Sequence, residues 1–386
     1  MISNFSYYNP VKIIFGKDTI RLVSKNIPEN AKIMITYGGG SIFKNTVYNQ
    51  VKNALLGHEI IEFGGIEVNP TFETLMKAVE LGRAEKVNFL LAVGGGSVID
   101  GTKFISAAIP FLDGNEWENI VLAKSRYKLA VPFGAILTLP ATGSEMNSGA
   151  VISKAATQEK YGMGGPLLFP KFSILDPETT FSLPKEQIAN GLADAFTHLM
   201  EQYLTYPVNA KIQDEFAEGI LRTLIEISPK VMANHTDYET MSNFMWAATT
   251  ALNGMLSVGV PTDWATHQIG HELTALHGID HARSLAVVLP HLMQYKLEDK
   301  KGKMIQFAKR VYNETGSEEE LVEKAIKNTI TFYESLGIPT KASAYGIGNK
   351  TIQKIKKRFS DRKVALGEQK DIYPDDIEKI LLMSIA

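Results

Sequence analysis

Short apolar segments rich in β-branched residues alternate with amphipathic stretches through the first half of the chain, and this alternation limits the fold more than any other feature. Strands are predicted at residues 31–37, 59–63, 89–93 and 135–139, and helices at residues 44–56, 71–85 and 97–108, with Thr71 at an N-cap position. Apolar strands separated by helices form βαβ units. The pattern therefore predicts a mainly parallel sheet covered by helices on both faces.

The second half is different, because from about residue 183 apolar residues recur at helical spacing and few strand-like runs remain. One helix is well bounded: Ser317 and Glu320 form a capping-box pair, Gly337 supplies a stop, and Pro339 prevents continuation. A chain of 386 residues suits two domains. We predict an α/β dinucleotide-binding domain with a Rossmann-like parallel sheet over residues 1–182, followed by an all-helical metal-binding domain over residues 183–386.

Charge and composition exclude several classes of protein. The chain has 40 Lys and Arg against 42 Asp and Glu, and its net charge of −2 gives no general attraction to nucleic acid or to an anionic membrane. No apolar run reaches the roughly 18 residues that a membrane-spanning helix needs, and the N-terminal residues lack the pattern of a secretory signal. We expect a cytoplasmic enzyme that acts on a small molecule, with neither nucleic acid nor membrane as a partner.

The tetrapeptide Gly-Gly-Gly-Ser occurs twice, each time directly after a predicted buried strand. The two copies are Gly38, Gly39, Gly40 and Ser41, and Gly94, Gly95, Gly96 and Ser97. Without a Cβ the backbone can approach a phosphate closely, and the N–H groups at the start of a following helix favour an anion. Two ordinary tight turns would give the same residues, since neither copy is a G-x-G-x-x-G fingerprint. We favour phosphate binding for the second copy, which leads into a helix.

The first copy also bears on which nicotinamide cofactor binds. In dinucleotide-binding folds an acidic residue after an early strand commonly holds the 2′-hydroxyl of NAD. Tyr37 and residues 38–41 include no carboxylate that would repel a 2′-phosphate, and Lys44 follows closely. These residues favour NADP(H) over NAD(H). The hydroxyl-rich residues 138–145 follow another predicted strand, and by themselves they are best interpreted as an ordinary Ser/Thr turn.

Histidines gather in the second half of the chain. With eight histidines and no cysteine, the chain can hold a metal only through nitrogen and oxygen ligands. Asp194 and His198 stand four residues apart in a predicted helix, so they differ by only about 40° around its axis and about 6 Å along it. The two side chains can therefore point at one ion. Four more histidines lie close together in the sequence, at His267, His271, His277 and His281.

These residues predict one divalent metal, Fe²⁺ or Zn²⁺, with a coordination position left open for catalysis. Gly278 is expected to end the helix that carries His267 and His271, which lets the chain fold back and bring His281 near. Spacing alone does not decide which histidines bind the metal and which only lie beside it, and His277 stays open. Ordinary core or surface roles are assigned to His58, His235 and His291.

At this point the sequence resembles the iron-containing, or group III, alcohol dehydrogenases, in which a His-x3-His-x9-His pattern follows an earlier Asp-x3-His. The resemblance covers essentially the whole chain. It implies that Asp194, His198, His267 and His281 bind the metal, with His271 beside them as a candidate proton relay. One departure is that Asp280 and Ala282 flank His281, where the family usually has Pro and Gly.

The resemblance also assigns cofactor contacts. It implies that residues 94–100 bind the pyrophosphate and nicotinamide, with Asp100 orienting the nicotinamide amide or the substrate as a catalytic residue. Residues 138–145 resemble the family's second cofactor loop, which includes Thr138 and Thr142. Asn69 and Lys160 also fall where the family contacts cofactor. The NADPH-dependent branch of butanol dehydrogenases and broad-range aldehyde reductases is the nearest match, and family precedent implies a homodimer.

The activity implied is hydride transfer between NADP(H) and short- to medium-chain aldehydes or alcohols. Two alternatives are a dehydroquinate-synthase-like lyase that uses NAD and zinc, and a non-catalytic protein that binds metal and nucleotide. The lyase needs a basic phosphate pocket near the metal. Few Lys or Arg residues lie among the histidines in the sequence, with Arg283 as the exception, and this argues against the lyase. Trp264 lies one turn before His267, and the sequence does not distinguish a role in the wall of the substrate site from a role in the core.

Overall fold

The computed structural model describes residues 1–123 and 127–385, and these residues divide into two compact units. The sheet unit consists of residues Tyr8–Pro184 and His235–Thr249. The helical unit consists of residues Met1–Tyr7, Lys185–Asn234 and Thr250–Ala386. The boundary at residues 184/185 coincides with the change from alternating strands and helices to helices alone. Residues 235–249 belong to the sheet unit, although they lie in the helical half of the sequence.

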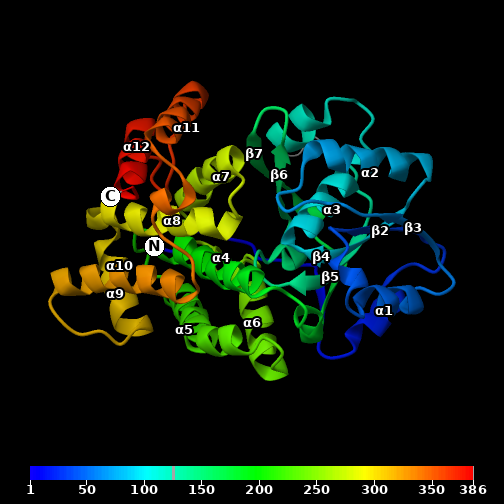
Figure 1. Ribbon diagram of the computed structural model, residues 1–386, viewed down its shortest axis with the longest axis horizontal. Coiled ribbons are helices and arrows are strands. Elements are labelled where there is room, and N and C mark those ends of the chain that lie inside the picture. The colour runs from blue at the N-terminus through cyan, green and yellow to red at the C-terminus, as the bar shows by residue number, and fades with distance from the viewer. Residues whose placement is uncertain (124–126, 386) are drawn as a thin grey trace. The chain divides into compact units, whose positions relative to one another are not determined.

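The sheet unit contains a six-stranded sheet in which every pair of neighbouring strands is parallel (Figure 1). Its order is β1 (Lys12–Phe15), β8 (Phe172–Leu175), β5 (Phe133–Leu139), β4 (Phe89–Gly95), β2 (Lys32–Tyr37) and β3 (Glu59–Phe63). The helices between strands are α1 (Val47–Ala54), α2 (Phe72–Ala84) and α3 (Gly96–Ala108). The predicted α/β fold with a parallel sheet, and each strand and helix named for this half, is confirmed.

Both faces of the sheet are buried, which explains why its strands are continuous apolar runs. Along β2, Ile33 and Ile35 pack in the core with α1, while Met34 packs on the opposite face with α2 and α3. The four-residue strands β1 and β8 were not predicted from the sequence. Each has only four residues, which is too few for a period of hydrophobic residues to be recognised in the sequence.

An antiparallel hairpin of β6 (Gly149–Lys154) and β7 (Glu159–Gly164) forms a second, two-stranded sheet. Ser153 N–H donates to the carbonyl of Pro70 at 2.9 Å, so the hairpin packs against the loop that precedes α2. This hairpin was not predicted from the sequence. Its strands contain glycines and charged residues, so their sequences do not show a regular alternation of apolar and polar positions.

Helix α6 (Tyr238–Ala251) contributes residues 238–249 to the sheet unit. Met245 lies in the core cluster beneath α2 and α3, and the Trp246 ring packs edge-on against Phe15 with 6.1 Å between ring centroids. Helical periodicity identifies such a segment as a helix, but it does not report which part of the chain the helix packs against.

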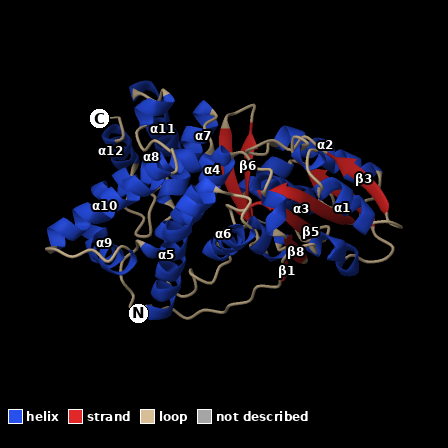
Figure 2. Ribbon diagram, turned by 60° about the horizontal axis from the view of Figure 1, so that its bottom comes forward, coloured by secondary structure: helices blue, strands red, loops and turns tan. Residues whose placement is uncertain are grey.

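Among the described residues, the helical unit contains eight α-helices besides the end of α6, and Figure 2 shows them gathered in this unit. They are α4 (Lys185–Tyr203), α5 (Lys211–Ala233), α7 (Ala265–His277), α8 (His281–Tyr295), α9 (Leu297–Val311), α10 (Glu318–Ser335), α11 (Asn349–Arg362) and α12 (Pro374–Met383). Helix α4 is buried over most of its length, which is expected of a helix surrounded by others. Within residues 1–123 and 127–385, no helix is both long and apolar enough to cross a membrane.

Two local predictions about helix ends hold in the helical unit. Ser317 Oγ accepts from Glu320 N–H at 3.3 Å, and Ser317 N–H donates to the Glu320 carboxylate at 2.8 Å, so the capping box of α10 is confirmed. Gly278 ends α7 with a φ of 68°, in the left-handed region that favours glycine. The chain turns there, and α8 begins at His281 only three residues later.

Candidate metal centre and nucleotide-binding loops

Helix α4 supplies the first two side chains of the metal centre. Asp194 and His198 lie one turn apart, and both residues are buried, with 3% and 4% of their surfaces exposed. The Nε2 atom of His198 lies 3.7 Å from Asp194 Oδ1. The spacing of four residues therefore places the carboxylate and the imidazole on one face of α4, as predicted.

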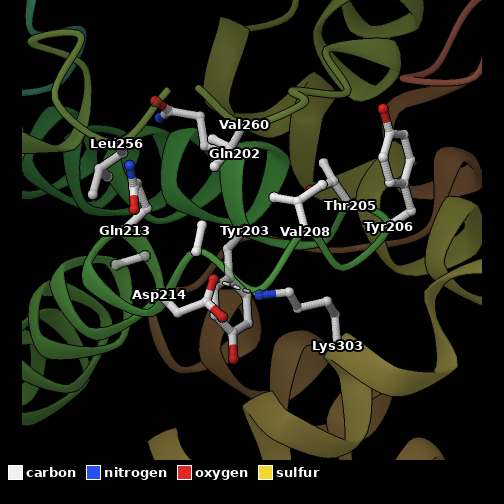
Figure 3. Close-up of a pocket in the computed structure, with 12 residues that line it drawn as sticks. Gln202, Tyr203, Thr205, Tyr206, Val208, Gln213, Asp214, Leu256, Val260 and Lys303 are labelled. Atoms are coloured by element: carbon white, nitrogen blue, oxygen red, sulfur yellow. Dashed lines mark hydrogen bonds and ion pairs between the residues drawn. The ribbon is translucent and has the colours of Figure 1, made fainter. Parts of the chain in front are cut away.

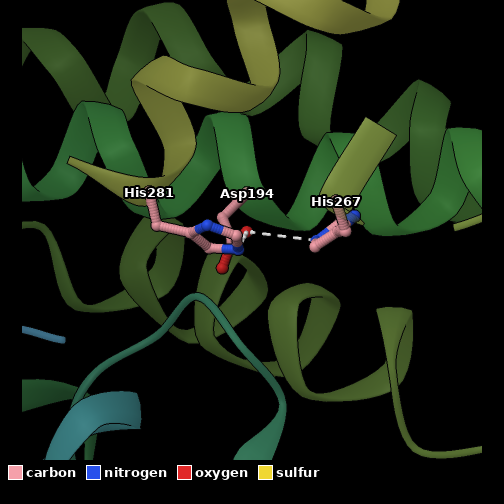
Figure 4. Close-up of side chains that lie close together, drawn as sticks. All are labelled: Asp194, His267 and His281. Carbon is pink, nitrogen blue, oxygen red and sulfur yellow. Dashed lines mark ion pairs between the residues drawn. The ribbon is translucent and has the colours of Figure 1, made fainter. Parts of the chain in front are cut away.

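The turn at Gly278 brings the other two histidines to the same carboxylate (Figure 4). His267, on the first turn of α7, places Nε2 4.0 Å from Asp194 Oδ1, and His281, the first residue of α8, places Nε2 3.8 Å from it. Ligand atoms of Asp194, His267 and His281 all lie within 4.8 Å of one another. The carboxylate and the three imidazoles that the family resemblance implies as metal ligands thus converge.

A divalent cation fits this arrangement. Within the described part of the chain, no group donates a hydrogen bond to Asp194 Oδ1, although the atom is buried. Distances of 3.7–4.0 Å to three imidazole nitrogens are too long for hydrogen bonds, but they suit atoms that each bind one ion at about 2.0–2.2 Å. A cation there would offset the cost of burying the carboxylate. Nitrogen and oxygen donors of this kind suit Fe²⁺ and Zn²⁺ alike.

The remaining histidines of the cluster lie in two different environments. The His271 ring is half-buried beside the centre, with its centroid 5.2 Å from that of His281 and 6.3 Å from that of His267. His277 is exposed at the end of α7, where its Nε2 lies 2.7 Å from Thr351 Oγ1. The Trp264 ring packs edge-on against His267 at 5.3 Å between centroids, so it forms part of the wall around the ligands.

Glu201 also belongs to the centre, although it was not predicted from the sequence. Its carboxylate contacts Nδ1 of His267 and accepts from Thr266 N–H at 2.6 Å. Burial raises the pKa of the Glu201 carboxyl well above its ordinary value, the Asp263 charge raises it further, and the Thr266 N–H opposes the rise. Glu201 lies seven residues, or two helical turns, after Asp194, so its position on the ligand-bearing face of α4 was readable from the sequence.

A buried lysine lies behind this arrangement. Lys300 Nζ lies 2.7 Å from Asp263 Oδ2 and 3.1 Å from the Glu368 carboxylate, and it donates to the carbonyl of Leu204 at 2.6 Å. All three charged side chains are at most 4% exposed. Burial lowers the pKa of Lys300, but the charges and hydrogen bonds of Asp263 and Glu368 together raise it above its ordinary value, so the ammonium stays charged. The ion triad fixes Asp263, the residue that comes two positions before α7.

A small hollow in the helical unit lies at the end of α4, on the side of Tyr203 (Figure 3). Several of its polar side chains have partners within the helical unit. Lys303 pairs with Asp214, its ammonium lies 4.7 Å from the centre of the Tyr203 ring, and Tyr203 donates to the buried Glu218 carboxylate at 2.9 Å. This hollow contains none of the metal-centre ligands, and we assign it no chemistry.

In the sheet unit, the predicted cofactor loops gather at one edge of the sheet. Parallel strands place their carboxyl ends at the same edge, and β5, β4, β2 and β3 are consecutive neighbours. Residues 38–41 follow β2, residues 94–97 end β4 and begin α3, and residues 138–145 continue from β5. The sheet order thus brings together three loops that are far apart in the sequence.

The glycines in these loops have separate structural reasons. Gly40 has a φ of +88°, which permits the tight turn after β2. Gly96 is the first residue of α3, and a Cβ there would lie 2.4 Å from the Thr142 side chain. A side chain at residue 96 would therefore disturb the packing of the 94–97 loop against the 138–145 loop. The N–H groups of the first turn of α3, including that of Ser97, lie beside this contact and suit a phosphate.

Asp100 has both carboxylate oxygens engaged by its own unit. Ser144 Oγ donates to Oδ1 at 2.6 Å, and Val151 N–H donates to Oδ2 at 2.8 Å. Burial raises the pKa of Asp100, while the Lys103 charge and the Ser144 hydrogen bond lower it. In this structure Asp100 joins α3 to the 138–145 loop and to strand β6. The catalytic and cofactor role that the family resemblance gives it stays a prediction.

Lys103, one turn after Asp100, completes this connection. Its buried ammonium donates to Ser144 Oγ at 2.7 Å, to Asn147 Oδ1 at 3.0 Å and to the Gly149 carbonyl at 2.6 Å. Burial lowers the pKa of Lys103 to about 8, and the carboxylates of Asp100 and Glu145 oppose that shift. Lys103 was not predicted from the sequence as part of the site, although its spacing from Asp100 places both side chains on one face of α3.

Asn69 and Lys160, which the family resemblance implies as cofactor contacts, contact each other. Lys160 Nζ donates to Asn69 Oδ1 at 2.7 Å, and Asn69 has a φ of 59°, which asparagine tolerates better than most residues. Asn69 precedes α2 and Lys160 lies on β7, so the hairpin brings them together. Their contact with cofactor remains a prediction.

Comparison with known protein families gives matches over most of both halves of the chain. The family described as "Iron-containing alcohol dehydrogenase" matches residues 10–177, and "Fe-containing alcohol dehydrogenase family, C-terminal" matches residues 188–385. The chain belongs to the iron-containing alcohol dehydrogenase family. The resemblance inferred from the histidine spacing is thereby confirmed, and so is the expectation of an alcohol dehydrogenase type of oxidoreductase.

Individual relatives of this alcohol dehydrogenase match it from end to end. The chain is 50% identical to the NADPH-dependent aldehyde reductase YqhD of Escherichia coli, over 98% of this chain and 99% of that protein. It is 38% identical to the NADH-dependent butanol dehydrogenase A of Clostridium acetobutylicum, over 99% of each chain. A crystal structure of the E. coli YqhD protein superposes with a TM-score of 0.97 at 49% identity, covering 99% of both chains.

The lowered pKa of Lys103 predicts how pH affects stability. An unfolded lysine titrates near 10.5, whereas Lys103 in the folded protein titrates near pH 8, so between about pH 8 and 10.5 the unfolded chain binds more protons. The contribution of Lys103 to the free energy of unfolding should therefore become more favourable as pH rises through this window. Urea unfolding of the wild type and Lys103→Met at several pH values measures it. We expect the free energy of unfolding of the wild type, measured relative to that of Lys103→Met, to increase as pH rises through this window. Parallel pH profiles for the two proteins would contradict the lowered pKa of Lys103.

Proposed function

We propose that this chain reduces short- and medium-chain aldehydes to alcohols, and catalyses the reverse reaction, with NADP(H) and one divalent metal. The observation that carries the proposal is the convergence of three imidazoles on the buried Asp194 carboxylate. The 50% identity to an NADPH-dependent aldehyde reductase, which extends over both units, supports the substrate class and the direction of the reaction.

The metal would be held by the Asp194 carboxylate and by the imidazoles of His198, His267 and His281. When bound, the metal would polarise the carbonyl oxygen and the nicotinamide would supply the hydride. The half-buried His271 ring, beside His281, is placed to carry the proton that the product oxygen takes up. Because the structure already brings these groups together, little reorganisation would be needed to reach the transition state.

The sheet unit would hold the cofactor at the edge where the three loops gather. The N–H groups at the start of α3, with the Ser97 hydroxyl, would bind the pyrophosphate. Asn69 and Lys160 would contact the cofactor as a hydrogen-bonded pair. Asp100 would keep residues 138–145, including Thr138 and Thr142, in place for the nicotinamide through its hydrogen bond with Ser144.

A lyase activity is disfavoured by the surroundings of Arg283. This residue was the one basic side chain near the histidines that could have bound a substrate phosphate. Its guanidinium instead lies 2.8 Å from the Glu186 carboxylate and 3.6 Å from that of Asp280. The carboxylates neutralise the charge that a phosphorylated substrate would require.

Separate substitutions should distinguish the metal ligand from the proton relay. His267→Ala removes one imidazole from the metal, so the purified variant should lose both bound metal and butanal-dependent oxidation of NADPH. His271→Gln should keep the metal and lower kcat roughly 100-fold, which is the lower end of the usual effect of a proton-transfer group. Elemental analysis of protein purified without added metal, with NADPH absorbance for turnover, measures both and also identifies iron or zinc.

His235→Ala is the matched control, because this half-buried histidine lies in the sheet unit and has no part in the proposed centre. It should keep wild-type metal content and rate. Full activity in His267→Ala would remove that residue from the ligand set. Wild-type turnover at its normal speed after the metal is stripped would refute the proposed function.

We expect kcat/KM for the nicotinamide cofactor, measured in butanal reduction, to be higher for NADPH than for NADH. Residues 38–41 leave no carboxylate to repel a 2′-phosphate, and Lys44 is exposed just beyond them. Parallel assays at saturating butanal with each cofactor measure the preference. A Gly39→Asp variant places a carboxylate there and should shift the preference toward NADH, whereas equal efficiency in the wild type would contradict the assignment.

A homodimer is the assembly that family precedent implies for this chain. Sedimentation velocity at micromolar concentration should give a species of twice the 42.6 kDa chain mass. A single species at the mass of one chain would overturn this assignment without affecting the proposed reaction.

A further inference from the structure

Glu201 lies on the same face of α4 as two of the proposed metal ligands. It follows His198 by three residues and Asp194 by seven, and only 2% of its surface is exposed. A carboxylate this deeply buried is costly unless hydrogen-bond donors surround it. The donors that Glu201 finds all belong to the first turn of α7.

Glu201 takes over much of the capping of α7. Thr266 N–H donates to Oε1 at 2.6 Å, and His267 N–H donates to Oε2 at 3.3 Å. Trp264, at the N-cap position, provides no side-chain hydrogen bond, and Asp263 accepts from Ala265 N–H at 2.9 Å. The positive end of the helix dipole also favours a carboxylate at this place. Because both oxygens of Glu201 receive backbone N–H groups, its carboxylate serves as an acceptor.

The same carboxylate contacts the His267 ring at Nδ1. An acceptor at Nδ1 places the ring proton there and leaves a lone pair on Nε2, the atom that lies 4.0 Å from Asp194 Oδ1. We propose that Glu201 is a positioning residue that holds His267 in the tautomer and orientation that a divalent cation at Asp194 requires. This inference rests on the proposed function, in that the cation is the one proposed above.

The buried ion triad supports Glu201 from behind. Asp263 N–H donates to the backbone carbonyl of Glu201 at 3.0 Å, and the Asp263 carboxylate pairs with Lys300. Trp264, between Asp263 and α7, has a φ of 66°, a conformation that bulky residues rarely adopt unless their neighbours fix it. Lys300 also pairs with Glu368, from the segment after α11, so a distant part of the chain helps fix the start of α7.

Metal retention tests the role of Glu201. Glu201→Gln keeps the size and one acceptor oxygen, but its amide N–H₂ must face either Thr266 N–H or the His267 ring. Glu201→Leu removes the acceptor altogether. We expect the metal-loaded protein to lose metal to excess EDTA about 10- to 100-fold faster in Glu201→Gln than in the wild type, and faster still in Glu201→Leu. Atomic absorption of desalted samples over time measures the loss.

Glu218→Gln is the matched control, because Glu218 is also a fully buried carboxylate of the helical unit, but its partners are Tyr203, Gln306 and Arg310 and none of them belongs to the metal centre. It should lower thermal stability and leave the rate of metal loss per folded molecule unchanged. Equal rates of metal loss in Glu201→Gln and Glu218→Gln would reduce Glu201 to a structural residue and overturn the proposal.

The tautomer can be measured without metal and without turnover. In metal-free protein labelled with ¹⁵N-histidine, two-dimensional NMR distinguishes a protonated Nδ1 from a protonated Nε2, and the signal missing in His267→Gln assigns the residue. We expect the Nδ1–H form in the wild type and in Glu218→Gln, and a mixture of tautomers in Glu201→Gln. An Nε2–H ring in the wild type would overturn the proposal. A wild type with the Nδ1–H ring that binds no cation would instead refute the proposed function and leave the placement of the proton intact.

Discussion

The buried carboxylate of Asp194 is the constraint around which the helical unit is organised. Its Oδ1 receives no hydrogen bond from the described residues, yet three imidazoles from α4, α7 and α8 lie 3.7–4.0 Å away. Such an atom is tolerable inside a protein only if positive charge compensates it. The reversal at Gly278 brings the histidines of α7 and α8 to this carboxylate on the buried helix α4.

The sequence predicted what depends on local spacing. Buried parallel strands are continuous apolar runs, so four of the six strands of the sheet were found, and the turn at Gly278 was expected from one residue. The ligand set came from the family resemblance, and the structure brings those four side chains together. What could not be predicted depends on packing partners far along the chain. Glu201 acts on the first turn of α7, and Lys300 joins Asp263 to Glu368, and neither contact leaves a periodic signal.

The two units use charge in the same way, although they share no sequence pattern. In the helical unit, Lys300 compensates two carboxylates next to α7. In the sheet unit, Lys103 lies beside Asp100, and both side chains hold Ser144 in the loop after β5. Each buried lysine fixes a loop or helix start beside a predicted functional group. The precision of these sites therefore depends on buried ionic networks as much as on the residues expected to touch substrate or cofactor.

The path of the chain through its two compact units has a practical consequence. The boundaries at residues 7/8, 184/185, 234/235 and 249/250 mean that the backbone passes from one unit to the other four times. Neither unit is a continuous stretch of sequence, so a fragment ending near residue 184 would lack Met245 and Trp246, which fill and flank its core. Dissection of the enzyme into separately expressed halves would expose apolar surface on the first fragment. The two units are thus expected to form during folding as interdependent parts rather than in succession from the ribosome.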